Sequence, residues 1–183
     1  MRSIAQNKAL RQLLWIGMGT IGMFFAGLTS AYIVRKAEGN WLDFTLPDWF
    51  LYSTITIIIS SLFLVLAKKN IENEKISSNL ILFVLILGLV FSYFQITGWK
   101  ELTNQGVFLT GVGSNVAGSF LYVITLSHLI HLIGGLIAIM FIVIRSRKGL
   151  YKDGNHLGFD LASWYWHFLG ILWIYLFFFL KYI

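Results

Sequence analysis

The 183-residue sequence has no cysteine, and this absence removes several kinds of chemistry. Without thiols the chain cannot form a disulfide, a thiolate metal site, a cysteine nucleophile or a c-type haem attachment. Charged residues are also scarce, at 12% of the chain, whereas a soluble domain carries about 25%. Hydrophobic residues make up 57%, and the mean hydropathy is +0.75. This composition predicts an integral membrane protein.

Long uncharged runs divide the sequence into five segments, each long enough to cross a hydrocarbon core of about 30 Å as a helix. In lipid a helix is expected because every backbone polar group must be satisfied within the segment. The first run is longer than the core of a signal peptide, so it predicts an anchor that is retained. The sequence predicts an all-α integral membrane protein, a single domain over 1–183, with transmembrane helices at about 12–34, 49–67, 76–99, 117–144 and 161–180.

Basic residues are distributed unevenly between the two ends of these segments. Four lie on the side of the C-terminus, at Arg35, Lys36, Lys100 and Lys181. Ten lie on the side of the N-terminus, at Arg2, Lys8, Arg11, Lys68, Lys69, Lys75, Arg145, Arg147, Lys148 and Lys152. Because cytoplasmic loops carry the excess of Lys and Arg, this pattern predicts an N-terminus inside and a C-terminus outside. The net charge of +6 therefore indicates topology, and no nucleic-acid partner is expected.

The central turns of the five segments contain no Asp, Glu, Lys or Arg. Their ionisable residues are His128, His131 and His167. Glu101 and Asp160 are expected at the membrane interfaces, Asp160 just before the last segment, where each carboxylate stays solvated or pairs with a basic residue. A proton relay needs titratable groups spaced through the membrane, so an autonomous pump or ion-coupled transporter is not expected. No nucleophile-elbow serine or phosphate-binding glycine loop is present either.

The three histidines within the segments are the candidates for a haem or metal site. From the expected helix ends, His131 lies 13 residues from Ile144, roughly 20 Å deep, and His167 lies 6 residues from Leu161, roughly 9 Å deep. An axial pair on one haem requires similar depth. His128 and His131 share a helix face, but no carboxylate or thiol completes a metal shell. We expect neutral histidines that form hydrogen bonds within the bundle or to a neighbouring subunit.

Small residues recur in the first and fourth segments, where they favour close helix packing within one bundle. The alternative is a gap used by a lipid or a substrate. These residues are Gly17, Gly19, Gly22, Ala26 and Gly27 in the first segment, and Gly134, Gly135 and Ala138 in the fourth.

An aromatic block around His167 opens the last segment, and Trp and Tyr at such a position are expected to anchor a helix at the headgroup interface. The run from His156 to Phe168, HLGFDLASWYWHF, with Trp173 beyond it, resembles the last helix of subunit III of haem–copper respiratory oxidases. Three further segments are similar to that family in the same order: Gly22 to Tyr32; Gln95 with Trp99 and Glu101; and Gly118-Ser119-Phe120 followed by Ser127 to Gly135, with its two spaced histidines.

The resemblance implies a non-catalytic subunit of the five-helix form in a bacterial inner (cytoplasmic) membrane, packed on the catalytic subunit I and surrounded by lipid. It places the haems and copper in partner subunits and no cofactor in this chain, and it leaves open a phospholipid bound between helices and membership of a larger respiratory supercomplex. The family-motif residues are expected to be structural: Glu101, His128, His131, Asp160, Trp164, Trp166, His167 and Trp173.

Two features depart from the family pattern. The longer members have seven helices, so a lipid cleft built partly by their first two is not implied here. Ile21 and Gly170 stand where the family often has carboxylates, so a proton-antenna role based on those groups is not carried over.

Several functions remain open on the sequence alone. The chain is expected to serve a cytochrome c oxidase, and the equivalent subunit of a quinol oxidase or of a nitric-oxide-reductase-associated relative is the near alternative. A stand-alone lipid-binding or transport protein, and a membrane cytochrome that uses its own histidines, belong to different classes.

Overall fold

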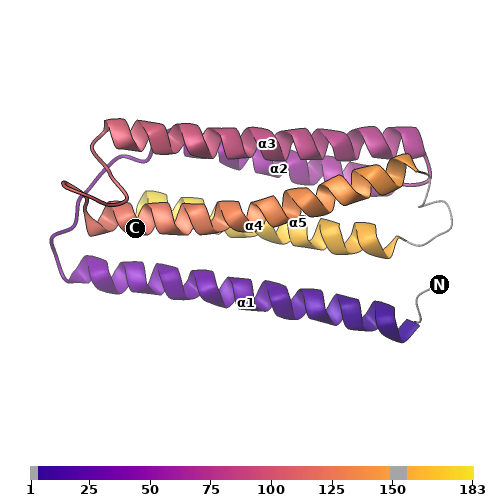
Figure 1. Cartoon of the computed structure of the whole chain (residues 1–183), viewed down its shortest axis with the longest axis horizontal. Helices are drawn as coiled ribbons and strands as arrows, with labels where there is room; N and C mark the ends of the chain where they lie inside the picture. The colour runs from indigo at the N-terminus through magenta and orange to yellow at the C-terminus, as the bar shows by residue number, and fades with distance from the viewer. Residues whose placement is uncertain (1–3, 149–155) are drawn as a thin grey trace.

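The computed structural model describes residues 4–148 and 156–183, and the regular structure in these residues is entirely α-helical (Figure 1). Five helices are long and apolar enough to cross a membrane. They are α1 (Ile4–Ala37), α2 (Trp49–Lys69), α3 (Glu74–Asn104), α4 (Val116–Arg147) and α5 (Leu157–Tyr182). The predicted all-α fold with five membrane-spanning helices is confirmed for this part of the chain.

Every helix extends beyond its predicted bounds. The predictions ended each helix where charge begins, but the helical hydrogen bonds continue past that point because Lys and Arg extend their charged groups toward water from within a helix. The largest difference is at the start of α1, which begins at Ile4 instead of about residue 12. At the other end of α1, Arg35 and Lys36 lie in the last turn, where positive charge favours the helix dipole.

Asparagine caps define the starts of α3 and α4. The Asn73 side chain accepts a hydrogen bond from the backbone N–H of Ile76 at 3.4 Å, and that of Asn115 accepts one from Ala117 at 2.9 Å. Asn115 also accepts from the Leu42 N–H at 3.3 Å and donates to the Asn40 carbonyl at 3.2 Å. The cap of α4 therefore holds the loop that follows α1.

Helices α2, α3, α4 and α5 form a closed bundle, in which each helix packs against two neighbours. Helix α1 lies outside this bundle and contacts only α4 and α5 among the described helices (Figure 1). The loops between α1 and α2 and between α3 and α4 lie at one end of the molecule, and the start of α1 and the loop between α2 and α3 lie at the other. The chain thus runs up and down through the bundle.

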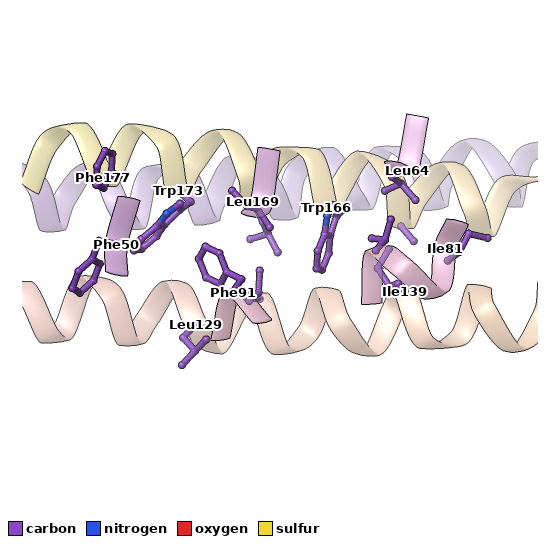
Figure 2. Packing of buried hydrophobic residues seen from close by; sticks show 14 of the residues in the cluster. Phe50, Leu64, Ile81, Phe91, Leu129, Ile139, Trp166, Leu169, Trp173 and Phe177 are labelled. Carbon is purple, nitrogen blue, oxygen red and sulfur yellow. The ribbon is translucent and has the colours of Figure 1, made fainter. Parts of the chain in front are cut away.

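Large aromatic side chains fill the centre of the bundle. Trp166 and Trp173 of α5 point toward α4, and both are fully buried (Figure 2). The Trp173 ring stacks on Phe50 at 6.1 Å between centroids and meets the edge of Phe91 at 5.1 Å. Next to Trp166, α3 has Gly88, where a Cβ would lie 2.6 Å from the indole. The Trp166 ring therefore fits in the core only because residue 88 of α3 is a glycine and has no side chain.

Helix α1 is attached mainly through its C-terminal half. Tyr32 packs edge-on against Trp41 and Phe179, with centroids 4.7 and 5.1 Å apart. The hydroxyls of Thr29 and Tyr175 are hydrogen-bonded at 2.9 Å. The ammonium group of Lys36 donates to the main-chain carbonyl of Ile183.

The small residues of α1 and α4 behave differently. A Cβ at Gly135 of α4 would lie 3.0 Å from Leu169 and 3.2 Å from Trp166, so this glycine permits close packing as expected. At Gly17, Gly19, Gly22 and Gly27 of α1, a Cβ would meet no atom of the described chain within 4 Å. The expectation that the α1 glycines allow close packing within this bundle is therefore wrong, because a side chain at any of these four positions would have open space around it.

Candidate functional site

A belt of polar side chains crosses the core and joins four helices through side-chain hydrogen bonds. The bonds run from Gln95 Nε2 to Ser53 Oγ at 2.8 Å, from Trp99 Nε1 to Thr125 Oγ1 at 3.0 Å, from Trp173 Nε1 to Thr54 Oγ1 at 3.0 Å, and from Trp166 Nε1 to Ser60 Oγ at 2.8 Å. They link α2 to α3, α3 to α4, and α2 to α5. Because buried N–H groups need acceptors, these bonds fix the helices in one register.

His128 lies at the centre of this belt and is fully buried. Its ring stacks on Trp173 with centroids 5.0 Å apart and an interplanar angle of 25°. The edges of Phe91 and Phe25 approach it at 5.8 and 6.4 Å. Rings from α1, α3 and α5 therefore enclose one imidazole of α4.

His131, one turn further along α4, has a different environment. It is half-buried, and its ring packs against Phe25 and Phe24 of α1 at 5.7 and 6.4 Å. Its Nδ1 is 2.7 Å from the main-chain carbonyl of Ser127, to which it donates. His131 thus forms the expected hydrogen bond within the bundle, and its partner is a carbonyl of its own helix.

His167 is half-buried and lies on the side of α5 that faces α2. One turn along this side, a Cβ at Gly170 would be 3.4 Å from the hydroxyl of Ser61 on α2. Two turns in the other direction, Asp160 pairs with Lys68 of α2. His131 faces α1 instead, so the two histidines point toward different helices.

The depth difference between His131 and His167 is smaller than predicted. His128 stacks on Trp173, and Gly135 lies against Trp166, so these contacts place His131 opposite Gly170. That is one helical turn, or about 5 Å, from His167. The prediction of roughly 11 Å was wrong because it assumed that α4 ends and α5 begins at the same depth, whereas this register places Leu157, the start of α5, opposite Ile144, and α4 continues to Arg147. The two rings are separated because His131 packs against α1 and His167 lies on the side of α5 that faces α2.

The aromatic block of α5 combines core and interfacial residues. Trp166 and Trp173 are fully buried, so the expectation that the whole block anchors the helix at the interface is wrong for these two. Trp164 fits that expectation better, because it is half-buried and its ring lies 5.9 Å from that of Trp15. The Arg11 guanidinium lies over the Trp164 ring at 5.7 Å.

The two carboxylates expected at the interfaces lie inside helices. Asp160 is in the first turn of α5, not before it, because α5 begins at Leu157. A negative charge there favours the helix dipole. Its carboxylate forms an ion pair with Lys68 of α2 at 2.8 Å. Glu101 is half-buried in the last turns of α3, which continues to Asn104.

The described residues bring no three His, Cys, Asp or Glu side chains into one group with the spacing of a metal shell. The residues that the sequence singled out are therefore dispersed: His128 lies with Trp173 in the core, His131 beside α1, Trp164 beside the N-terminal half of α1, and Asp160 with Lys68. What joins them is packing between helices.

A groove of about 500 Å³ opens where α1, α4 and α5 diverge. Its wall is apolar and is hollowed by small residues, with one cation, Arg145, among the lining side chains. The lining residues include Leu14 of α1, Gly134, Ala138 and Arg145 of α4, and Gly158 and Tyr165 of α5. The Tyr165 hydroxyl donates to the His131 carbonyl at 3.1 Å.

Sequence reasoning missed the hydroxyl groups of α2 that receive the buried N–H groups. Ser53, Thr54 and Ser60 are visible as polar residues in an apolar run. However, Ser53 and Thr54 also donate to the Phe50 carbonyl of their own helix, at 2.8 and 2.7 Å. Because a hydroxyl in a membrane helix is satisfied in this way without any partner, its presence alone does not indicate a contact with another helix.

The fold and these contacts define the chain as a multi-pass helical membrane protein. Its buried polar side chains form hydrogen bonds that connect one helix to another. Comparison with known proteins narrows the class. The sequence model of the family "Cytochrome c oxidase subunit III" matches residues 44–183, which include α2 to α5. The chain therefore belongs to the cytochrome c oxidase subunit III family.

Individual relatives agree with this assignment. A probable cytochrome c oxidase subunit 3 of Nocardia farcinica is 30% identical over 167 residues, covering 85% of this chain and 78% of the relative. The corresponding protein of Mycobacterium tuberculosis is 31% identical over 163 residues, with the same coverage. Cytochrome c oxidase subunit 3 of Artemia franciscana is 32% identical over 97 residues, which are 53% of this chain and 35% of that protein.

Proposed function

We propose that the chain is the non-catalytic subunit III of a haem–copper terminal oxidase in aerobic respiration, and that it packs on and supports the catalytic subunit I. The observation that carries the proposal is the family match over residues 44–183, which spans the whole closed bundle. The test is purification from native membranes in mild detergent. A haem-bearing subunit should accompany the chain, and isolation of the chain without one would contradict the proposal.

The loose attachment of α1 supports a partner in the membrane. Of its 34 residues, only Met18, Phe25, Thr29 and Tyr32 are buried. Helices in lipid are held together by packing and hydrogen bonds, because lipid tails are as apolar as the helix surface. A helix with so few buried residues gains little packing energy from its own bundle. Contacts with another oxidase subunit would supply the rest of the packing that holds α1 in place.

The proposed orientation places the N-terminus in the cytoplasm of a bacterial cell and the C-terminus outside. The basic residues near the start of α1, the end of α2 and the end of α4 gather at one end of the bundle (Figure 1). Two members of the predicted set, Arg2 and Lys152, lie outside the described residues. An excess of Lys and Arg on the cytoplasmic side favours this orientation in the inner membrane.

The haems and copper of the oxidase are proposed to reside in partner subunits, and the histidines of this chain to be structural. Support comes from their environments: His128 is enclosed by aromatic rings, and His131 donates to its own helix. His131 and His167 face different helices. The runner-up assignments, a quinol oxidase or a nitric-oxide-reductase-associated relative, differ from the first in the electron-donor site, which another subunit would carry.

A bound phospholipid is the one ligand proposed for this chain, and the groove between α1, α4 and α5 is its proposed site. Its apolar wall suits an acyl chain, and Arg145 suits a phosphate. The groove therefore has the polarity expected along one leaflet of a bilayer.

Replacing Arg145 with alanine should reduce the phospholipid that co-purifies with the oxidase. The guanidinium is the only cation lining the groove in the described part of the chain, so its loss removes the proposed phosphate contact. The measurement is phospholipid per subunit after extraction from the purified complex. Arg147→Ala is the matched control, because Arg147 is exposed and does not line the groove. Equal lipid content in the wild type and the Arg145→Ala variant would contradict the site.

A further inference from the structure

His128 and Gln95 carry buried polar atoms that no described residue satisfies. His128 is 0% exposed and Gln95 is 1% exposed. Neither ring nitrogen of His128 has a hydrogen-bond partner within residues 4–148 and 156–183. Gln95 donates its Nε2 to Ser53, but its Oε1 also has no partner there. Buried polar groups in proteins are nearly always paired, either with protein atoms or with internal water.

The two side chains lie at the same depth in the bundle. The hydrogen bond between Trp99 and Thr125 sets the register of α3 against α4. Gln95 lies four residues before Trp99 on α3, which places it about 6 Å deeper in the bundle than Trp99. His128 lies three residues after Thr125 on α4, which places it about 4.5 Å deeper than Thr125. The antiparallel helices therefore carry Gln95 and His128 to within about 1.5 Å of one another in depth.

Helix α2 gives a second, independent measure of this proximity. Gln95 donates to Ser53, and the next residue, Thr54, accepts from Trp173, whose ring stacks on His128. On α3, Phe91 is one turn from Gln95 and meets the His128 ring with its edge. The rings of Phe91 and Trp173 both contact His128, and Gln95 lies one turn from Phe91 on α3 and bonds to the chain neighbour of Thr54, the acceptor of Trp173.

We propose that an internal water molecule binds between His128 and Gln95 and joins α3 to α4 at the centre of the membrane. A neutral imidazole has one donor and one acceptor nitrogen, whereas Gln95 Oε1 only accepts. Water supplies both a donor for Oε1 and a complementary group for one ring nitrogen. A metal ion is a poorer occupant, because no carboxylate or thiolate of the described residues is placed to complete its shell.

The first test is a density map of the intact purified oxidase at a resolution that shows ordered water. The proposal predicts a density peak within hydrogen-bonding distance of both Gln95 Oε1 and a ring nitrogen of His128. Direct contact between the two side chains, or a filled core with no density between them, would overturn it. This test needs no variant, so it does not depend on the folding of altered chains.

The second test is a double-substitution cycle with Gln95→Leu and His128→Leu in the complex, measured as the shift in melting temperature of this subunit. Either substitution removes one partner of the water, so the double variant should lose less than the sum of the two single losses. Additive losses would overturn the proposal. The matched control is His131→Leu combined with Gln95→Leu, which should be additive because His131 donates to its own helix.

Discussion

Replacing Trp166 with alanine is expected to destabilise the chain by about 3–5 kcal/mol, the range for loss of a buried aromatic side chain. The indole is 0% exposed, and its N–H donates to Ser60 at 2.8 Å. It also fills the space left by Gly88 of α3 and lies against Gly135 of α4. Removing it opens a cavity where α2, α3, α4 and α5 meet. The measurement is the melting temperature of the subunit in mild detergent.

Trp15→Ala is the control for this substitution. Trp15 is 61% exposed and contacts the Trp164 ring from the N-terminal half of α1, outside the closed bundle. Its replacement removes the same number of atoms but leaves no cavity between helices, so the loss should be well below that of Trp166→Ala. Equal losses for the two variants would show that Trp166 does not have the packing role assigned to it.

Replacing Gly88 with valine should be the second most damaging change, with a loss of at least about 1–3 kcal/mol from overpacking. A Cβ alone at this position would lie 2.6 Å from both Leu136 and the Trp166 ring. The Leu136 side chain is flexible, but the indole is rigid and fully buried, so α3 must move away from α5. We expect a lower melting temperature and a weakened bond between Trp166 and Ser60.

Gly19→Val tests whether this effect comes from packing rather than from helix propensity. A Cβ at Gly19 meets no described atom within 4 Å, and both glycines lie in the interior of a membrane helix. In the isolated chain, Gly19→Val should leave the melting temperature nearly unchanged. A loss similar to that of Gly88→Val would mean that the close contact at Gly88 is not the cause.

Much of the fold could be predicted from the sequence because the bilayer constrains it so strongly. Uncharged runs of sufficient length located all five helices, since lipid permits few alternatives for the backbone. Their ends were less predictable. Charge marks where the membrane ends, whereas hydrogen bonding decides where a helix begins and ends, as the caps Asn73 and Asn115 do at the starts of α3 and α4. Asp160 was consequently expected before α5 and lies within it.

The arrangement of the site residues could be predicted only in part. The aromatic block correctly indicated the family, but its residues look alike in sequence, although Trp164 packs against the N-terminal half of α1 and Trp166 lies in the core. The glycines show the same limit. Those of α1 form the more conspicuous pattern, yet Gly88, which stands alone in sequence, makes the closest approach. Which face of a helix meets a neighbour depends on register, and register is set by contacts between distant residues such as Trp99 and Thr125.

The most direct test of the proposed function is an inventory of the subunits that purify with this chain from native membranes in mild detergent, combined with an absorption spectrum. The proposal predicts a haem-bearing catalytic subunit in the complex and a Soret band that belongs to it. A copper-bearing partner with the ligands of a two-copper site would support cytochrome c as the electron donor, and a partner without them would favour quinol. A chain that purifies alone, or that carries a Soret band of its own lost in His131→Ala, would contradict the assignment of this protein as the cofactor-free subunit III of an oxidase.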